Sequence, residues 1–125
     1  MRLFHYLTPH EKYDAVNNDG KSAIGSSPHT DWGYLTLIMA EEAGLEANID
    51  DEWVTIEPLP KEENAFLINC GDWLAYHTRG RYVSPLHRVR AAVDRERFSS
   101  VFFHYPDYNA DGSVISSRIG DIAGN

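Results

Sequence analysis

This chain of 125 residues has little of the features that mark several common classes of protein. It has one cysteine, Cys70, so no disulfide can form within the chain, and this fits a reducing compartment. Only 11 lysines and arginines face 19 acidic residues, and the net charge of −8 argues against general nucleic-acid binding. No apolar run approaches the roughly 18–20 residues that span a bilayer, and Met1–Tyr6 does not resemble a signal peptide. These absences predict a cytoplasmic protein with no nucleic-acid or membrane partner.

What the sequence does contain is sufficient for one folded domain, since 42% of the residues are hydrophobic and 12% are aromatic. About seven short apolar segments separated by turn residues predict an all-β sandwich or barrel. The predicted strands are 2–7, 34–39, 44–49, 52–58, 65–69, 82–89 and 97–104. We expect 65–69 to be a fully buried strand, 8–28 to be a polar connection, and 72–78 to form a short helical turn capped by Asp72.

The motif His29-Thr30-Asp31 places two metal-binding side chains two positions apart. On an extended strand both side chains point to the same face. A distant histidine such as His87, brought close by the fold, would complete the two imidazoles and one carboxylate that non-heme Fe(II) oxygenases use. This ligand set alone does not exclude Zn, Co, Ni or Mn, because affinity by itself does not select iron.

Arg97 and Ser99 form a second pair two positions apart, downstream of His87. A guanidinium and a hydroxyl on one strand face suit a carboxylate, although an isolated pair of this kind is more often an exposed strand pair without function. Metal ligands followed by a carboxylate anchor predict an enzyme rather than a structural domain.

Four segments of the chain resemble the isopenicillin N synthase-like, 2-oxoglutarate/Fe(II)-dependent dioxygenase family. Residues 27–38 (SPHTDWGYLTLI) are similar to the proximal metal-binding segment of that family, and residues 78–89 (TRGRYVSPLHRV) to its distal-histidine segment. Residues 68–74 (INCGDWL) resemble the strand end and turn between them, and residues 97–103 (RFSSVFF) match the co-substrate motif. The order and spacing of these segments agree with the family.

The resemblance implies a double-stranded β-helix, or jelly roll, with the metal in the open mouth between two sheets. It predicts an Fe(II)/2-oxoglutarate dioxygenase domain over residues 1–110 and a polar C-terminal tail over residues 111–125. Family members carry a helical region ahead of this core. We therefore expect a C-terminal catalytic segment or a reduced relative, and the N-terminal region of a longer parent chain is a candidate partner.

The resemblance also implies the cofactors, which are Fe(II), 2-oxoglutarate as co-substrate, and O2. His29, Asp31 and His87 would hold the iron. The implied activity is the oxidation, for example hydroxylation, of a small organic molecule with release of succinate and CO2.

The resemblance assigns the 2-oxoglutarate carboxylate that lies away from the metal to Arg97 and Ser99, and less firmly to the Tyr6 hydroxyl. Arginine suits this role because its guanidinium can bind a carboxylate through two parallel hydrogen bonds. Trp32 and Tyr34, next to the metal ligands in the sequence, are expected to line the substrate pocket.

Two alternatives stay open at the level of sequence. One is an oxidase of the same family that does not use 2-oxoglutarate, since isopenicillin N synthase carries the same Arg-x-Ser pair and uses it on its own substrate. The other is a truncated metal-binding remnant without turnover.

Overall fold

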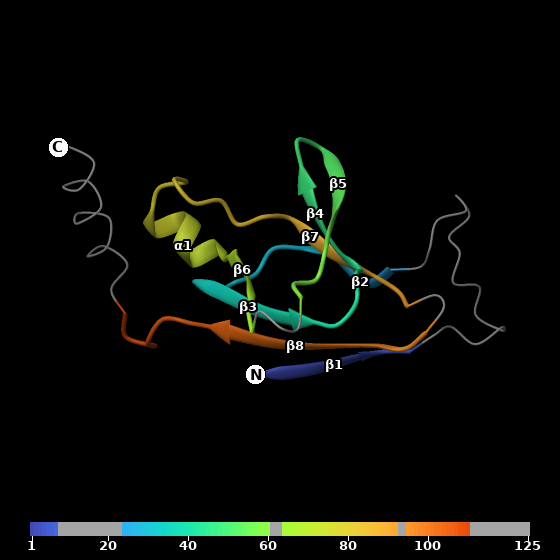
Figure 1. Ribbon diagram of the computed structural model, residues 1–125. Helices are drawn as coiled ribbons and strands as arrows, with labels where there is room; N and C mark the ends of the chain where they lie inside the picture. The colour runs from blue at the N-terminus through green and yellow to red at the C-terminus, as the bar shows by residue number, and fades with distance from the viewer. Residues whose placement is uncertain (8–23, 61–63, 93–94, 111–125) are drawn as a thin grey trace.

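Eight strands form two four-stranded antiparallel sheets in the computed structural model, which describes residues 1–7, 24–60, 64–92 and 95–110 (Figure 1). In spatial order, the first sheet contains β1 (Arg2–Tyr6), β8 (Arg97–His104), β3 (Leu35–Ala40) and β6 (Leu67–Cys70). The second contains β2 (Ile24–His29), β7 (His87–Arg90), β4 (Leu45–Ile49) and β5 (Glu52–Ile56). The helix α1 (Asp72–His77) follows β6.

The chain passes from one sheet to the other at almost every connection, as a double-stranded β-helix requires. Of the strands that the structure describes, only β4 and β5 follow each other within one sheet, as a hairpin in which Ile49 pairs with Glu52. Its two-residue turn is Asp50-Asp51, with φ of 51° and 65°. Two positive φ values match the right-handed twist of a hairpin, and aspartate tolerates them better than most residues. The all-β jelly-roll prediction is confirmed.

The alternation of side chains along β8 separates the inside of the molecule from the outside. Arg97 and Val101 are buried, whereas Phe98 and Phe102 are exposed on the opposite face of the strand. Among the described residues, Val101 and Ala92 are the only buried hydrophobic residues, and the others are at least partly exposed. The space between the sheets is therefore a lined cavity more than a packed apolar core.

Several local expectations need correction. β2 occupies residues 24–29, most of which the sequence had assigned to a polar connection, while residues 8–23 and the tail 111–125 lie outside the described part of the chain. β7 is shorter than predicted, since the chain has no regular structure over 83–86. The segment 65–69 is not fully buried, because Phe66 and Ile68 lie on the outer face, half-exposed.

The predicted helical turn is present as α1, but its cap differs from the expected one. Gly71, with extended backbone, occupies the N-cap position, and the helix has no side-chain cap. Asp72 is instead the first helical residue, and its carboxylate accepts a hydrogen bond of 3.1 Å from the Thr30 hydroxyl. Among the described residues, no helix is both long enough and apolar enough to cross a lipid bilayer.

Candidate metal centre

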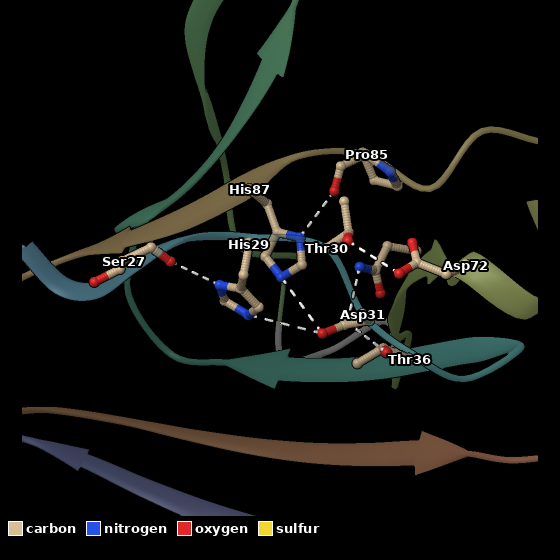
Figure 2. A network of polar contacts seen from close by, with 9 residues as sticks. Ser27, His29, Thr30, Asp31, Thr36, Asp72, Pro85 and His87 are labelled. Carbon is tan, nitrogen blue, oxygen red and sulfur yellow. Dashed lines mark hydrogen bonds and ion pairs between the residues drawn. The ribbon is translucent and has the colours of Figure 1, made fainter.

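The fold brings His29, Asp31 and His87 together although the chain separates them widely. His29 ends β2 and His87 begins β7, and the two residues are paired directly across these antiparallel strands. Asp31 lies in the loop between β2 and β3. One ligand atom from each of the three side chains lies within 4.8 Å of the others (Figure 2). Asp31 Oδ1 is 3.7 Å from His29 Nε2 and 3.8 Å from His87 Nε2.

Both imidazole rings are oriented by a backbone carbonyl two residues earlier. Nδ1 of His29 lies 2.7 Å from the carbonyl oxygen of Ser27, and Nδ1 of His87 lies 3.0 Å from that of Pro85 (Figure 2). Because a carbonyl can only accept, each Nδ1 carries a proton and donates it. In the neutral ring, Nε2 then keeps a free lone pair directed at Asp31. This is the arrangement that orients histidines around a metal.

The Asp31 carboxylate is also held by two donors. Its Oδ2 accepts hydrogen bonds from the Thr36 hydroxyl at 2.5 Å and from the Asn69 side-chain amide at 3.1 Å. Oδ1 is left facing the two imidazoles. Asp31 is almost completely buried, and a buried carboxylate favours a cation beside it. The two nitrogens and one carboxylate oxygen fit a divalent first-row metal such as Fe(II).

A glycine fixes the loop that carries Asp31. The backbone N–H of Asp72 donates to the Asp31 carbonyl at 2.7 Å, and that of Gly71 donates to the Tyr34 carbonyl at 2.9 Å. A Cβ at Gly71 would lie 2.0 Å from the carbonyl oxygen of Gly33, so no other residue fits there without displacing the loop. The Gly-Asp turn therefore positions the metal ligand, although it supplies no ligand atom itself.

Arg97 lies in the same cavity as the three ligands, buried between the two sheets. Its Nη1 donates to the carbonyl of Ala43 at 2.9 Å and its Nη2 to the carbonyl of Arg90 at 2.7 Å. Its Nε is buried and has no hydrogen-bond partner among the described residues. None of the ion pairs in the described ranges involves this guanidinium. Burial lowers the pKa of Arg97, an effect that Tyr6 and Glu42 oppose.

The guanidinium fits only because Gly44 has no side chain. Gly44 has a φ of +149°, and a Cβ there would lie 1.4 Å from Arg97 Nη1 and 2.4 Å from its Cζ. The Gly44 carbonyl accepts a hydrogen bond of 2.8 Å from the Arg90 N–H, which closes the backbone around the guanidinium.

Ser99 and Tyr6, the other two predicted 2-oxoglutarate residues, line the same cavity. Ser99 lies in the middle of the first sheet, between Phe4 and Ala40 on the neighbouring strands. Tyr6 presents the face of its ring to Arg97, whose Cζ is 4.4 Å from the ring centroid, in a cation–π contact. A hydrogen bond from the Tyr6 hydroxyl to a co-substrate stays a prediction.

Trp32 and Tyr34 lie outside the cavity of the metal ligands, and their place in a substrate pocket stays a prediction. Neither lines the cavity that holds the metal ligands and Arg97. The Trp32 side chain is 73% exposed and lines a separate cavity. The Tyr34 hydroxyl is hydrogen-bonded to Nδ1 of His77, a histidine that is completely buried. On strands and tight loops, adjacent side chains point in different directions, so proximity to a ligand in sequence does not place a residue in its pocket.

Sequence reasoning missed Thr36, Asn69 and Gly44. Thr36 and Asn69 are polar residues in otherwise apolar strand segments, which is a signal for a buried hydrogen-bonding partner. Nothing in the sequence around Gly44 indicates that it contacts a residue more than fifty positions away.

Comparisons with known proteins agree with this geometry. The family model of the 2OG-Fe(II) oxygenase superfamily matches residues 1–106. Clavatol oxidase claD of Penicillium crustosum is 36% identical over 117 residues, which is 91% of this chain and 32% of that protein. Jasmonate-induced oxygenase 2 of Arabidopsis thaliana is 38% identical over 86 residues, 67% of this chain and 22% of that protein. The chain therefore spans about a third or less of the length of these relatives.

A solved structure shows the same fold with the co-substrate present. AtDAO1, dioxygenase for auxin oxidation 1 of Arabidopsis thaliana, was solved as a binary complex with 2-oxoglutarate. It matches with a TM-score of 0.69 and 29% identity, over 87% of this chain and 38% of that chain.

Proposed function

This chain belongs to the 2OG-Fe(II) oxygenase superfamily, and on that premise we propose that it binds Fe(II) and 2-oxoglutarate as the catalytic part of an enzyme that oxidises a small organic molecule. The observation that carries the proposal is that a three-ligand metal site and a buried arginine without an ion-pair partner among the described residues line one cavity. The domain boundary at residue 110, the small-molecule substrate and a cytoplasmic location are parts of the same proposal.

In this proposal His29, Asp31 and His87 hold the iron, which supplies the activation of O2 when it is bound together with 2-oxoglutarate. The protein keeps the two imidazoles in the tautomer that can bind metal, through the carbonyls of Ser27 and Pro85. The three ligands come from one side, so the remaining coordination positions are open to exogenous ligands.

The carboxylate of 2-oxoglutarate that lies away from the metal is assigned to Arg97. A guanidinium has five N–H donors, and the structure uses two of them on backbone carbonyls, which fixes the orientation of the group. Of the other three donors, the Nε–H is buried and has no hydrogen-bond partner among the described residues, and we assign these donors to the carboxylate. Ser99 supplies a hydroxyl on the same wall of the cavity, and the ring of Tyr6 covers one face of the guanidinium.

The walls between the metal ligands and Arg97 are apolar. They consist of side chains from both sheets, namely Ile38, Leu45, Val89, Val101 and Phe103. An apolar wall lowers the local dielectric constant. This strengthens the attraction of Asp31 for a metal ion and of Arg97 for a carboxylate. It also presents few groups to a reactive oxygen species other than the intended substrate, so the protein contributes orientation and protection while the metal and co-substrate supply the chemistry.

An anaerobic titration with Fe(II) followed by 2-oxoglutarate, monitored by visible absorption, tests this function. We expect a weak charge-transfer band only when both are present. In Arg97→Ala the iron should still bind, while 2-oxoglutarate binding should weaken by roughly 2–4 kcal/mol because a buried charge pair is lost. Arg81→Ala is the matched control, since Arg81 is exposed and does not line the cavity.

The alternatives predict different results in the same titration. Iron binding without the band, or equal 2-oxoglutarate affinity in Arg97→Ala and the parent chain, would overturn the 2-oxoglutarate assignment. The oxidase would then be the better interpretation if the chain consumes O2 with an added substrate but forms no succinate. A chain that binds iron and 2-oxoglutarate but forms no succinate with any substrate would be a remnant.

A further inference from the structure

A second cavity lies outside the metal centre and is lined by three aromatic side chains and one carboxylate. The lining residues are Trp32, Asp72, Trp73 and Tyr76, and none of them lines the cavity of the metal ligands. Trp32 comes from the loop after β2, and the other three come from α1. The cavity measures about 260 Å³, slightly below the roughly 300–1,000 Å³ of pockets that enclose whole small-molecule ligands. Its size suits the head group of a ligand.

Two of the aromatic residues are unusually exposed for their size. Trp32 is 73% exposed and Tyr76 is 77% exposed, although burial of such side chains contributes strongly to stability. Two large exposed rings at the mouth of a cavity form a binding surface more often than two scattered rings do.

His77 packs against two of the rings that line this cavity. The ring of His77 is completely buried and packs edge-on against Trp73, with ring centroids 4.9 Å apart and an interplanar angle of 78°. It also contacts Tyr76 at 5.5 Å between centroids. Its Nδ1 is hydrogen-bonded to the Tyr34 hydroxyl.

The loop that carries Trp32 is fixed to α1 by hydrogen bonds. The N–H of Asp72 donates to the carbonyl of Asp31, and the N–H of Trp73 donates to the carbonyl of Gly33 at 3.2 Å, so both neighbours of Trp32 are anchored. The Thr30 hydroxyl donates to the Asp72 carboxylate and orients it. A site held in this way loses little conformational entropy when a ligand binds.

We propose that this cavity binds a methylated ammonium group, quaternary or tertiary, on a small molecule or a methylated side chain. The faces of tryptophan and tyrosine rings carry negative potential and attract cations, and a cage of aromatic rings is the usual receptor for quaternary ammonium groups. Asp72 adds a full negative charge, and the net charge of −8 attracts cations to the protein as a whole. The lining offers a primary ammonium few acceptors, whereas methyl groups pack against the rings.

This binding activity goes beyond the proposed oxygenase function and needs neither iron nor 2-oxoglutarate. It can therefore be tested on the metal-free chain, and its failure would leave the oxygenase proposal untouched. The chain contains three tryptophans, of which Trp32 and Trp73 line the cavity and Trp53 lies on β5. Their three indole N–H signals in an NMR spectrum of the ¹⁵N-labelled chain report separately on the site and on the remainder of the protein.

The experiment titrates the labelled chain with choline and, in parallel, with 3,3-dimethyl-1-butanol, the neutral molecule of the same shape. We expect choline to shift the Trp32 and Trp73 indole signals in a saturable way and to leave the Trp53 signal unchanged. The neutral alcohol should bind at least about fivefold more weakly than choline. Ethanolamine, which carries a primary ammonium, should also bind more weakly than choline.

Two variants and one control test the assignment to these residues. Asp72→Asn keeps an oxygen that can accept the Thr30 hydrogen bond but removes the charge, and Tyr76→Leu removes a ring that is 77% exposed. Each should weaken choline binding about three- to tenfold. Tyr108→Leu, at a fully exposed tyrosine outside the cavity, should leave binding unchanged.

Three results would overturn the proposal. Equal binding of choline and the neutral alcohol would mean that the cavity recognises apolar shape alone. Equal binding of choline and ethanolamine would exclude a preference for methylated ammonium. Shifts of all three indole signals to a similar extent, or none at Trp32 and Trp73, would mean that choline has no site there.

Discussion

The cavity between the two sheets has a metal end, formed by His29, Asp31 and His87, and an arginine end, formed by Arg97. The charged groups at the two ends differ in their hydrogen-bond partners. At the metal end, Asp31 Oδ2 accepts two hydrogen bonds, so the carboxylate is satisfied on one side and open only toward the two imidazoles. At the other end, two donors of Arg97 bind backbone carbonyls, while Nε has no partner among the described residues. The first end presents a carboxylate whose outer oxygen is hydrogen-bonded, and the second presents a guanidinium that forms no ion pair with any described residue.

This difference indicates how the two ends depend on their surroundings. A buried charge without a compensating partner destabilises the folded state, and one held by aligned donors or acceptors does so less. At the metal end, side chains align the Asp31 carboxylate while backbone carbonyls orient the two imidazoles. The arginine end relies on the backbone around Gly44 and on the aromatic ring of Tyr6. Substitutions at the two ends should therefore separate metal binding from co-substrate binding.

The largest effect is expected for Asp31→Ala. This change removes the only anionic ligand of the candidate metal site and leaves two imidazoles, so Fe(II) affinity should fall by more than about 100-fold. It also leaves the Thr36 hydroxyl and the Asn69 amide without an acceptor. Anaerobic calorimetric titration of Fe(II) measures the loss.

Asp31→Asn separates the loss of the ligand from damage to the fold. The asparagine oxygen can accept the hydrogen bonds from Thr36 and Asn69, so thermal stability should stay closer to that of the parent chain while iron affinity still falls strongly. Stoichiometric iron in either variant at the parent affinity would show that Asp31 is not a ligand.

Gly44→Ala should disturb the position of the Arg97 guanidinium without changing Arg97 itself. The new methyl group would occupy the position of Nη1, and the φ of +149° is unfavourable for alanine. We expect the guanidinium to be displaced and 2-oxoglutarate affinity to fall by about 2 kcal/mol, with iron affinity unchanged. The titration described above for Arg97→Ala measures both quantities in this variant.

Gly80→Ala is the matched control for backbone strain. Gly80 also has a positive φ, of +78°, but a Cβ there would meet no atom within 4 Å. Its substitution should cost about 1 kcal/mol of stability and leave 2-oxoglutarate affinity unchanged. If both alanine variants reduced the affinity for 2-oxoglutarate equally, the cause would be backbone strain and not displacement of the Arg97 guanidinium.

The sequence identified the functional groups that line the cavity better than the residues that hold these groups in position. His29, Asp31, His87 and Arg97 were identified because the segments around them resemble the motifs of the oxygenase family, while their residue types and spacings alone are weak evidence. The residues that align them are less constrained in type. A hydroxyl or an amide can donate a hydrogen bond to a carboxylate from many positions in the chain. A glycine is required where another segment approaches the backbone too closely for a side chain, and the sequence does not show which segments meet.

The fold was predictable at the level of class, for a related reason. Alternation of apolar residues identifies strands, and β8 has the predicted bounds, Arg97–His104. β2 was missed because Ile24–His29 contains serines, a proline and a glycine, which are typical of turns. Pairing with β7, irregular at two points, holds this segment extended against its local preference.

The smallest effect is expected for Thr36→Val, which tests whether side-chain alignment of Asp31 contributes to metal binding. Valine keeps the shape of the buried side chain and removes the hydroxyl that donates to Oδ2, while Asn69 remains as a second donor. We expect iron affinity to fall about tenfold, within the usual range for residues that orient a metal ligand. Thr55→Val, at an exposed position of β5, should leave iron affinity unchanged. Equal affinity in both variants would mean that Asn69 and the backbone around Asp31 suffice to hold the carboxylate, and that the metal end, like the arginine end, depends mainly on its backbone.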